Sequence, residues 1–111
     1  MTWRTLRTLL GSAVLFGGLH GAAAQGAEWR YCLALSPARH TVYMSAPFPN
    51  SELMETVEAE FGRVLDRASL PHDSVQCPRG GDAQSIAAMK QQAMQFNQAS
   101  GNKVVQINWR P

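Results

Sequence analysis

Residues 29–35 (WRYCLAL) constrain the fold most, because they combine a strand pattern with one of the chain's two cysteines. Bulky apolar groups recur at every second position, as they do on one face of a strand; these are Trp29, Tyr31, Leu33 and Leu35. Cys32 falls on the opposite face, where its thiol can reach a second element. The stretch therefore predicts a core strand that is covalently tied to another part of the chain.

The 111-residue chain opens with the pattern of an export signal. Arg4 and Arg7 form a short positive segment, an apolar run covers residues 9–19, and three alanines at 22–24 suit a signal peptidase. The apolar run is shorter than the about 20 residues that a membrane-spanning helix needs. We predict a signal peptide over residues 1–24, cut after Ala24 or alternatively after Gly26. One exported domain over residues 25–111 follows, periplasmic or secreted, with no membrane span after signal removal.

The positive charge of the full chain belongs to the predicted signal. Without its two arginines, eight basic residues face eight acidic residues in the mature part. A near-neutral domain lacks the electrostatic footprint that binding to nucleic acid or anionic lipid requires. We therefore expect no nucleic-acid partner.

The only two cysteines are Cys32 and Cys77. In an exported chain, a single pair of cysteines predicts one intramolecular disulfide. The alternative is a reactive or metal-binding thiol. A domain of this size has a modest core, so a covalent link would contribute much of its stability.

The remaining pattern predicts a second strand over residues 41–45, close enough to the first to form an antiparallel hairpin. A helix is predicted to start after an N-cap at Ser51 or Asn50 and to end near Ala68, because apolar residues recur at three- and four-residue spacing. A second helix is predicted after an N-cap at Asp82 and before Gly101, with an apolar stripe of Ile86, Met89, Ala93 and Phe96. Residues 103–109 predict a closing strand, and residues 74–77 a short strand or extended loop.

Two helices with one apolar stripe each predict a single helical layer on one sheet. The expected fold is α+β: a small two-layer sandwich with a three- to four-stranded antiparallel sheet, two helices on one face and one disulfide. In its content this fold resembles the small periplasmic domains of the SPOR type, which bind peptidoglycan through a sheet. Those domains alternate strand, helix, strand, strand, helix, strand, whereas a hairpin comes first here. The resemblance therefore implies peptidoglycan as a partner but assigns no site residue.

Two groups of residues invite a catalytic interpretation. His40, His72 and Asp73 could bind a metal or exchange protons, but their spacing matches no ligand motif and both histidines fall in predicted loops. Glu52, Glu55 and Glu58 share a helix face near a helix start, where negative charge suits the dipole without any catalytic role. We predict no catalytic residues, no metal ligands and no cofactor.

Two other groups invite a binding interpretation. The aromatic residues Trp29, Tyr31, Tyr43 and Trp109 could form a stacking platform, although strand spacing favours core packing. A stripe of glutamines on the second helix is uncharged and rich in hydrogen-bonding groups, which suits either a solvated face or a partner face; its members are Gln84, Gln91, Gln95 and Gln98.

The sequence thus favours a small exported, non-enzymatic protein that binds another envelope protein or an envelope polymer. The alternative is a small hydrolase or metal-dependent enzyme that uses the loop histidines and Asp73. A third interpretation is an accessory subunit that docks through a strand edge or through the glutamine stripe.

Overall fold

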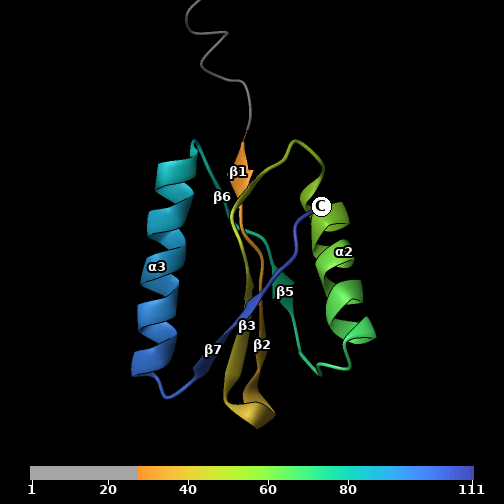
Figure 1. Cartoon of the computed structure of the whole chain (residues 1–111), viewed down its shortest axis with the longest axis vertical. Helices are drawn as coiled ribbons and strands as arrows, with labels where there is room; N and C mark the ends of the chain where they lie inside the picture. The colour runs from red at the N-terminus through yellow and green to blue at the C-terminus, as the bar shows by residue number, and fades with distance from the viewer. Residues whose placement is uncertain (1–27) are drawn as a thin grey trace, which may run out of the picture.

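The computed structural model describes residues 28–111, so the predicted signal peptide and its cleavage site lie outside the described residues. The described part contains two α-helices, one 3-10 turn and seven short strands. In chain order these are β1 (Trp29–Arg30), β2 (Leu33–Ser36), η1 (Pro37–Arg39), β3 (Thr41–Ser45), β4 (Phe48–Pro49), α2 (Met54–Arg67), β5 (Val75–Gln76), β6 (Arg79–Gly80), α3 (Ala83–Ala99) and β7 (Lys103–Ile107). The α+β class is confirmed (Figure 1).

The main sheet has four strands in the order β5-β2-β3-β7. The predicted hairpin is confirmed: β2 and β3 pair antiparallel from Leu33 opposite Met44 to Ser36 opposite Thr41, and η1 joins them. The expectation of a fully antiparallel sheet is wrong, because β7 lies parallel to β3. The reason is the path of α3, which carries the chain back to the η1 end, where Lys103 N–H donates to His40 O at 2.7 Å.

A second, three-stranded sheet in the order β4-β1-β6 continues the first. Three chain segments contribute a strand to each sheet, and β7 belongs to the main sheet alone. Each of the three segments breaks at the same level: at residues 31–32, 46–47 and 77–78. Pro47 and Pro78 lie at two of these breaks, and proline has no N–H for a ladder. The single strand predicted over residues 29–35 is therefore two short strands.

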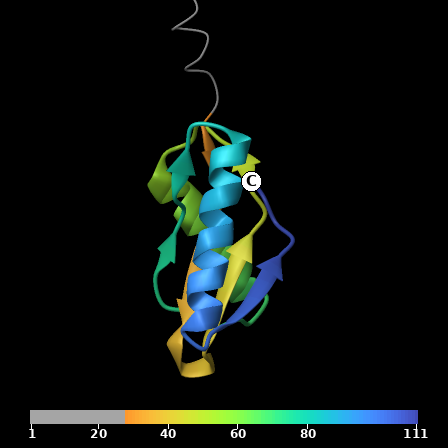
Figure 2. The same ribbon diagram turned by 90° about the vertical axis from the view of Figure 1, so that its left-hand side faces the viewer.

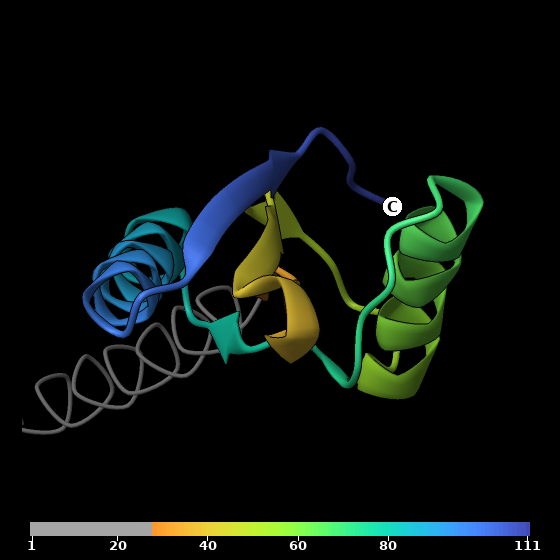
Figure 3. The same cartoon turned by 90° about the horizontal axis from the view of Figure 1, so that it is seen from below.

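The two helices lie on opposite faces of the sheet, so the two-layer arrangement with both helices on one face is wrong (Figures 1 and 3). One core cluster joins Cys32, Ala34 and Tyr43 to α2, and the other joins Leu33, Val42 and Met44 to Ile86 of α3. The physical reason is that β2 and β3 are apolar on both faces, and each face must be covered.

Helix α2 begins later than the sequence predicted. It starts at Met54, and its N-cap residue Leu53 has no side-chain acceptor for the first N–H groups. Asn50 does not cap the helix; its Oδ1 accepts from Glu52 N–H in the preceding turn. Val57, Phe61 and Leu65 of the predicted stripe are fully buried against the sheet, whereas Leu53 and Met54 are exposed at the helix start.

Helix α3 has the predicted cap but not the predicted stripe. Asp82 Oδ1 accepts from Ser85 N–H at 2.7 Å, and Gly101 has a φ of 88° just past the helix end, as the left-handed position requires. Ile86 is fully buried and Ala93 packs beside it, but Phe96 is 71% exposed and Met89 is also exposed. Asn97 is buried in their place, where its Nδ2 donates to Ala93 O.

The predicted disulfide Cys32–Cys77 is confirmed, and both cysteines are buried in the core cluster beneath α2. It joins the start of β2 to the break between β5 and β6, at the level where both sheets meet. Backbone groups around it are also bonded: Cys32 N–H donates to Ser45 Oγ at 2.8 Å, and Ser45 N–H donates to Cys32 O at 2.9 Å. The disulfide therefore links two of the chain segments at the level where the two sheets meet.

Removal of this disulfide should strongly destabilise the domain. Closing a loop of 45 residues removes unfolded-state entropy worth about 4 kcal/mol, which is comparable with the net stability of a small domain, about 5–15 kcal/mol. The double variant Cys32→Ala/Cys77→Ala should lose about that free energy of unfolding in urea titrations followed by circular dichroism. A loss below about 1 kcal/mol would contradict this account of the stability.

The cap of α3 should make stability depend on pH. Hydrogen bonds from Ser85 hold the pKa of Asp82 below its ordinary value of 3.8. A lowered folded-state pKa stabilises above the unfolded-state pKa, and this contribution is lost as the pH falls through the folded-state pKa. The melting temperature of Asp82→Ala should therefore lie below that of the wild type at neutral pH, and the difference should shrink below pH 3.8.

Asp82→Asn is the matched control, because asparagine keeps the acceptor oxygen and does not titrate. Its melting temperature should stay close to that of the wild type at neutral pH. A gap between wild type and Asp82→Ala that is equally large at acidic and neutral pH would contradict the role of the charge.

Candidate functional site

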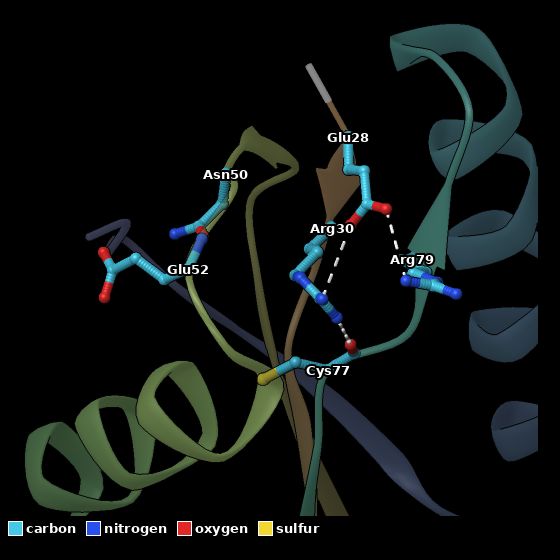
Figure 4. Close-up of polar contacts among 6 residues, drawn as sticks. All are labelled: Glu28, Arg30, Asn50, Glu52, Cys77 and Arg79. Carbon is cyan, nitrogen blue, oxygen red and sulfur yellow. Dashed lines mark hydrogen bonds and ion pairs between the residues drawn. The ribbon is translucent and has the colours of Figure 1, made fainter. Parts of the chain in front are cut away.

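A cleft of about 510 Å³ lies at the end where β1 and β6 meet the start of α2. One wall carries Glu28, Arg30 and Arg79 from the small sheet. The other wall is the turn 51–53 and the first residues of α2, including Glu52 and Glu55. Figure 4 shows Arg30 reaching down between these two walls toward the disulfide. The cleft is therefore lined by both positive and negative side chains.

Arg30 is the unusual member of the cleft, because it is only 4% exposed. Its Nη1 donates to Cys77 O at 2.9 Å, which ties the guanidinium to the disulfide. Its Nη2 lies 3.6 Å from Glu28 Oε2, and its Nε has no hydrogen-bond partner among the described residues. One edge of a buried guanidinium thus lacks an acceptor at hydrogen-bond distance, which is costly for a charged group.

Glu28 links this buried arginine to the surface. Its Oε1 accepts from Arg79 Nη1 at 3.2 Å, and Arg79 itself is largely exposed. Glu28 is thus shared between two arginines, one buried and one exposed. An exposed pair of this kind contributes little stability. The backbone of Glu28 is also held, because its O accepts from Asn50 N–H at 2.9 Å.

The second candidate is the outer edge of β7. Among residues 28–111, no strand pairs with β7 on the side away from β3. Lys103 N–H points to β3, and backbone groups alternate along a parallel strand, so Val105 and Ile107 also face β3. Val104 and Gln106 therefore direct their N–H and C=O groups outward. Figure 2 shows β7 emerging beside α3 at this side of the sheet.

The charge around β7 is one-sided. From Ala83 to Pro111 the chain has three basic residues and no acidic residue; the three are Lys90, Lys103 and Arg110. Lys90 Nζ donates to Gln106 Oε1 at 2.7 Å, and burial lowers the pKa of Lys90. The acidic residues of α2 lie across the sheet from α3 (Figure 3), and the charged residues within α3 and β7 themselves are Lys90 and Lys103.

The glutamines predicted as a partner face are all exposed on α3. The stripe contains Gln84, Gln91, Gln95 and Gln98, and no hydrogen bond within the described residues occupies their side chains. Exposed Phe96 and Met89 also lie on the outer surface of this helix. Binding of a partner to this stripe stays a prediction.

The loop residues of the catalytic alternative do not line the cleft. His72 Nδ1 is 2.9 Å from Leu70 O in its own turn, and Asp73 N–H donates to Leu35 O at 2.8 Å. His40 follows η1 with a φ of 48°. Within residues 28–111, no three side chains of His, Cys, Asp or Glu are grouped to hold a metal ion. The catalytic interpretation stays an untested hypothesis.

The aromatic residues do not form one platform. Tyr31 and Tyr43 are buried in different core clusters, on opposite faces of the sheet. Trp29 packs beside α3, whereas Trp109 packs on the other face against Phe61 and Phe48, at centroid distances of 5.3 and 5.8 Å. Core packing, which the strand spacing favoured, accounts for all four residues.

Sequence reasoning missed the cluster of Glu28, Arg30 and Arg79. A signal for Arg30 was present: the two-residue period places it on the same face as Cys32 and Ala34. A charged residue on a face that also carries a disulfide cysteine indicates a buried charge, and buried charges need partners. Glu28 and Arg79 carry no comparable signal, because 51 residues separate them in the sequence.

Comparisons of the chain with protein-family models, with curated proteins and with solved structures find no match. The two helices of residues 28–111 are both too short or too polar to cross a membrane.

Proposed function

We propose that this protein is a small exported, non-enzymatic binding protein of the cell envelope, and that it captures an extended acidic segment of another protein as an added strand along β7. The observation that carries the proposal is the unpaired outer edge of β7, flanked by basic residues. Addition of a strand to a free sheet edge is a general mode of peptide recognition.

Export is supported by two independent features. The sequence opens with a positive segment, an apolar run and small residues, in the order that a signal peptide has. The domain also contains a buried disulfide, and disulfides are typical of proteins outside the reducing cytoplasm.

The backbone of β7 supports capture of an extended chain. Val104 and Gln106 direct their N–H and C=O groups away from β3, so a partner strand can bond to both residues. An unpaired edge of this kind is a template for another chain, and proteins that do not use such an edge cover or shorten it. With five residues, β7 matches the usual length of a strand.

The side chains of β7 support recognition of apolar side chains on both faces of a partner strand. Val104 contacts the α3-side cluster, whereas Val105 and Ile107 contact the α2-side cluster. All three are only half-buried, so each apolar layer still has open surface at this edge. A partner strand with apolar residues would extend both layers.

Charge complementarity favours an acidic partner. Lys103 starts β7, Lys90 is bonded to Gln106 over the strand, and Arg110 follows the strand end. No acidic residue occurs in this part of the chain to neutralise them. Carboxylates of a partner strand would therefore meet Lys103 at the start of the edge and Lys90 beside Gln106, which guides both orientation and association rate.

The proposal predicts that Gln106→Pro prevents binding without unfolding the domain. Proline removes the outward N–H of residue 106 and obstructs an added strand, but it leaves the bonds to β3. The probe is a ten-residue peptide that alternates valine and glutamate, and the measurement is fluorescence polarisation with a labelled peptide. Gln106→Pro should weaken binding by at least about tenfold, the effect of about 1.4 kcal/mol.

Hydrogen exchange locates the binding. The amide protons of Val104 and Gln106 should exchange readily in the free protein and become protected by the peptide, whereas that of Val105 should be protected in both states. The matched control is Gln91→Ala/Gln95→Ala on the outer face of α3, which should bind like the wild type. A valine-lysine peptide should bind much less than the valine-glutamate peptide.

Three results would overturn the proposal. Unchanged binding by Gln106→Pro would exclude the β7 edge, and loss of binding by Gln91→Ala/Gln95→Ala would move the interface to the glutamine stripe. A photo-reactive residue at position 106 in exporting cells that cross-links only to a second copy of the chain would replace the acidic partner with a homodimer.

Export itself predicts a defined mature terminus. The protein recovered from an exporting cell should begin at Gln25, or at Ala27 if cleavage follows Gly26. N-terminal sequencing and the intact mass measure this directly. Recovery of the full chain from the cytoplasm with both thiols free would contradict export.

A further inference from the structure

The cleft between Arg30 and α2 is lined by residues that the proposed β7 interface does not use. Arg30 has a buried edge whose Nε lacks a hydrogen-bond partner among the described residues. A guanidinium binds a carboxylate through two parallel bonds, and the side-on edge uses Nε and Nη2. Nε has no partner, and Nη2 is 3.6 Å from Glu28, whereas Nη1 is occupied by Cys77 O. The edge that lacks acceptors is therefore the edge that recognises carboxylates.

The opposite wall of the cleft adds a second positive element. Helix α2 starts at Met54 without a side-chain cap, so its first N–H groups have no capping side chain. The dipole of the helix adds to the partial positive charge at this end. Leu53, Met54 and Glu55 all line the cleft, which places the helix start and Arg30 around one space.

The rim of the cleft carries the opposite charge. Glu52 and Glu55 are exposed and line the same space, whereas Glu28 is held between the two arginines. Three carboxylates and two guanidiniums line the cleft, so a bare anion would meet a net negative wall. A ligand with both a carboxylate and an ammonium group can satisfy both signs at once.

We infer that this cleft binds a short zwitterionic peptide, with its carboxylate on the free edge of Arg30 and its ammonium group at Glu52 and Glu55. The volume of about 510 Å³ lies in the range of small-molecule sites, about 300–1,000 Å³. Binding would supply the acceptor that Arg30 Nε lacks. The site shares no residue with the β7 edge, so it is independent of the proposed partner strand.

The direct test follows the Arg30 Nε–Hε signal by NMR during titration with the dipeptide alanyl-alanine. The signal should move as the carboxylate binds, because the proton acquires a charged acceptor. Two matched probes each remove one charge: N-acetyl-alanyl-alanine lacks the ammonium group, and alanyl-alaninamide lacks the carboxylate. Alanyl-alanine should bind best, the acetylated dipeptide more weakly, and the amide should not move the Arg30 signal.

Variants separate the two ends of the ligand. Arg30→Lys keeps the charge but removes the planar edge, and should lower affinity for alanyl-alanine by at least about tenfold. Glu55→Gln, on the surface, should weaken the binding of alanyl-alanine but leave the binding of the acetylated dipeptide unchanged. This variant also tests the inference if Arg30→Lys does not fold. Arg63→Lys, exposed on α2, is the control that should bind like the wild type.

The inference is overturned if the Arg30 Nε–Hε signal does not move with alanyl-alanine at concentrations on the order of 10 mM, tenfold above a millimolar dissociation constant. It is also overturned if alanyl-alaninamide moves that signal as much as alanyl-alanine does. Equal affinity of wild type and Glu55→Gln for alanyl-alanine would contradict the proposed ammonium site, and with it the assignment of a zwitterionic ligand.

Discussion

The buried disulfide Cys32–Cys77 is the interaction on which the rest of this structure depends, because it lies where two sheets, a helix and a charged cleft meet. The backbone groups of its two cysteines form hydrogen bonds with several different elements. Cys77 O accepts from Arg30, Cys77 N–H donates to Glu58 of α2 at 3.3 Å, and Cys32 is bonded twice to Ser45 of β3. The disulfide thus joins two of the three chain segments at this level, and the hydrogen bonds between Cys32 and Ser45 join the third.

The break in the sheet creates the geometry of the cleft. Residues of the small sheet β4-β1-β6 form one wall of the cleft, and the start of α2 forms the other. Arg30 lies on the side of the small sheet that faces the start of α2. A buried charge is tolerated there because Cys77 O satisfies one nitrogen and Glu28 lies nearby.

Two faces of the sheet need two helices, and this requirement leaves one edge open. With α2 on one face and α3 on the other, the chain has no further element among residues 28–111 to cover the outer side of β7. The four-stranded sheet therefore ends on a strand whose three apolar side chains are only half-buried. The open edge and the charged cleft lie in different places, and each has its own chemistry.

The sequence by itself determined the local features. The alternation of residues 29–35, the hairpin with β3, the cap at Asp82 and the left-handed position of Gly101 all follow from interactions between residues close in the chain. The disulfide could also be predicted, because two cysteines in an exported chain allow only one pairing.

Only the tertiary structure decided how these elements are arranged. The alternation in residues 31–35 was between large and small apolar groups, not between apolar and polar ones, so both faces of β2 require cover and the helices separate. The exposure of Phe96 and the burial of Asn97 depend on how α3 lies across β7. The spacing of apolar residues within one helix does not predict that packing. The cluster of Glu28, Arg30 and Arg79 joins residues 51 positions apart, and only the folded sheet brings such residues together.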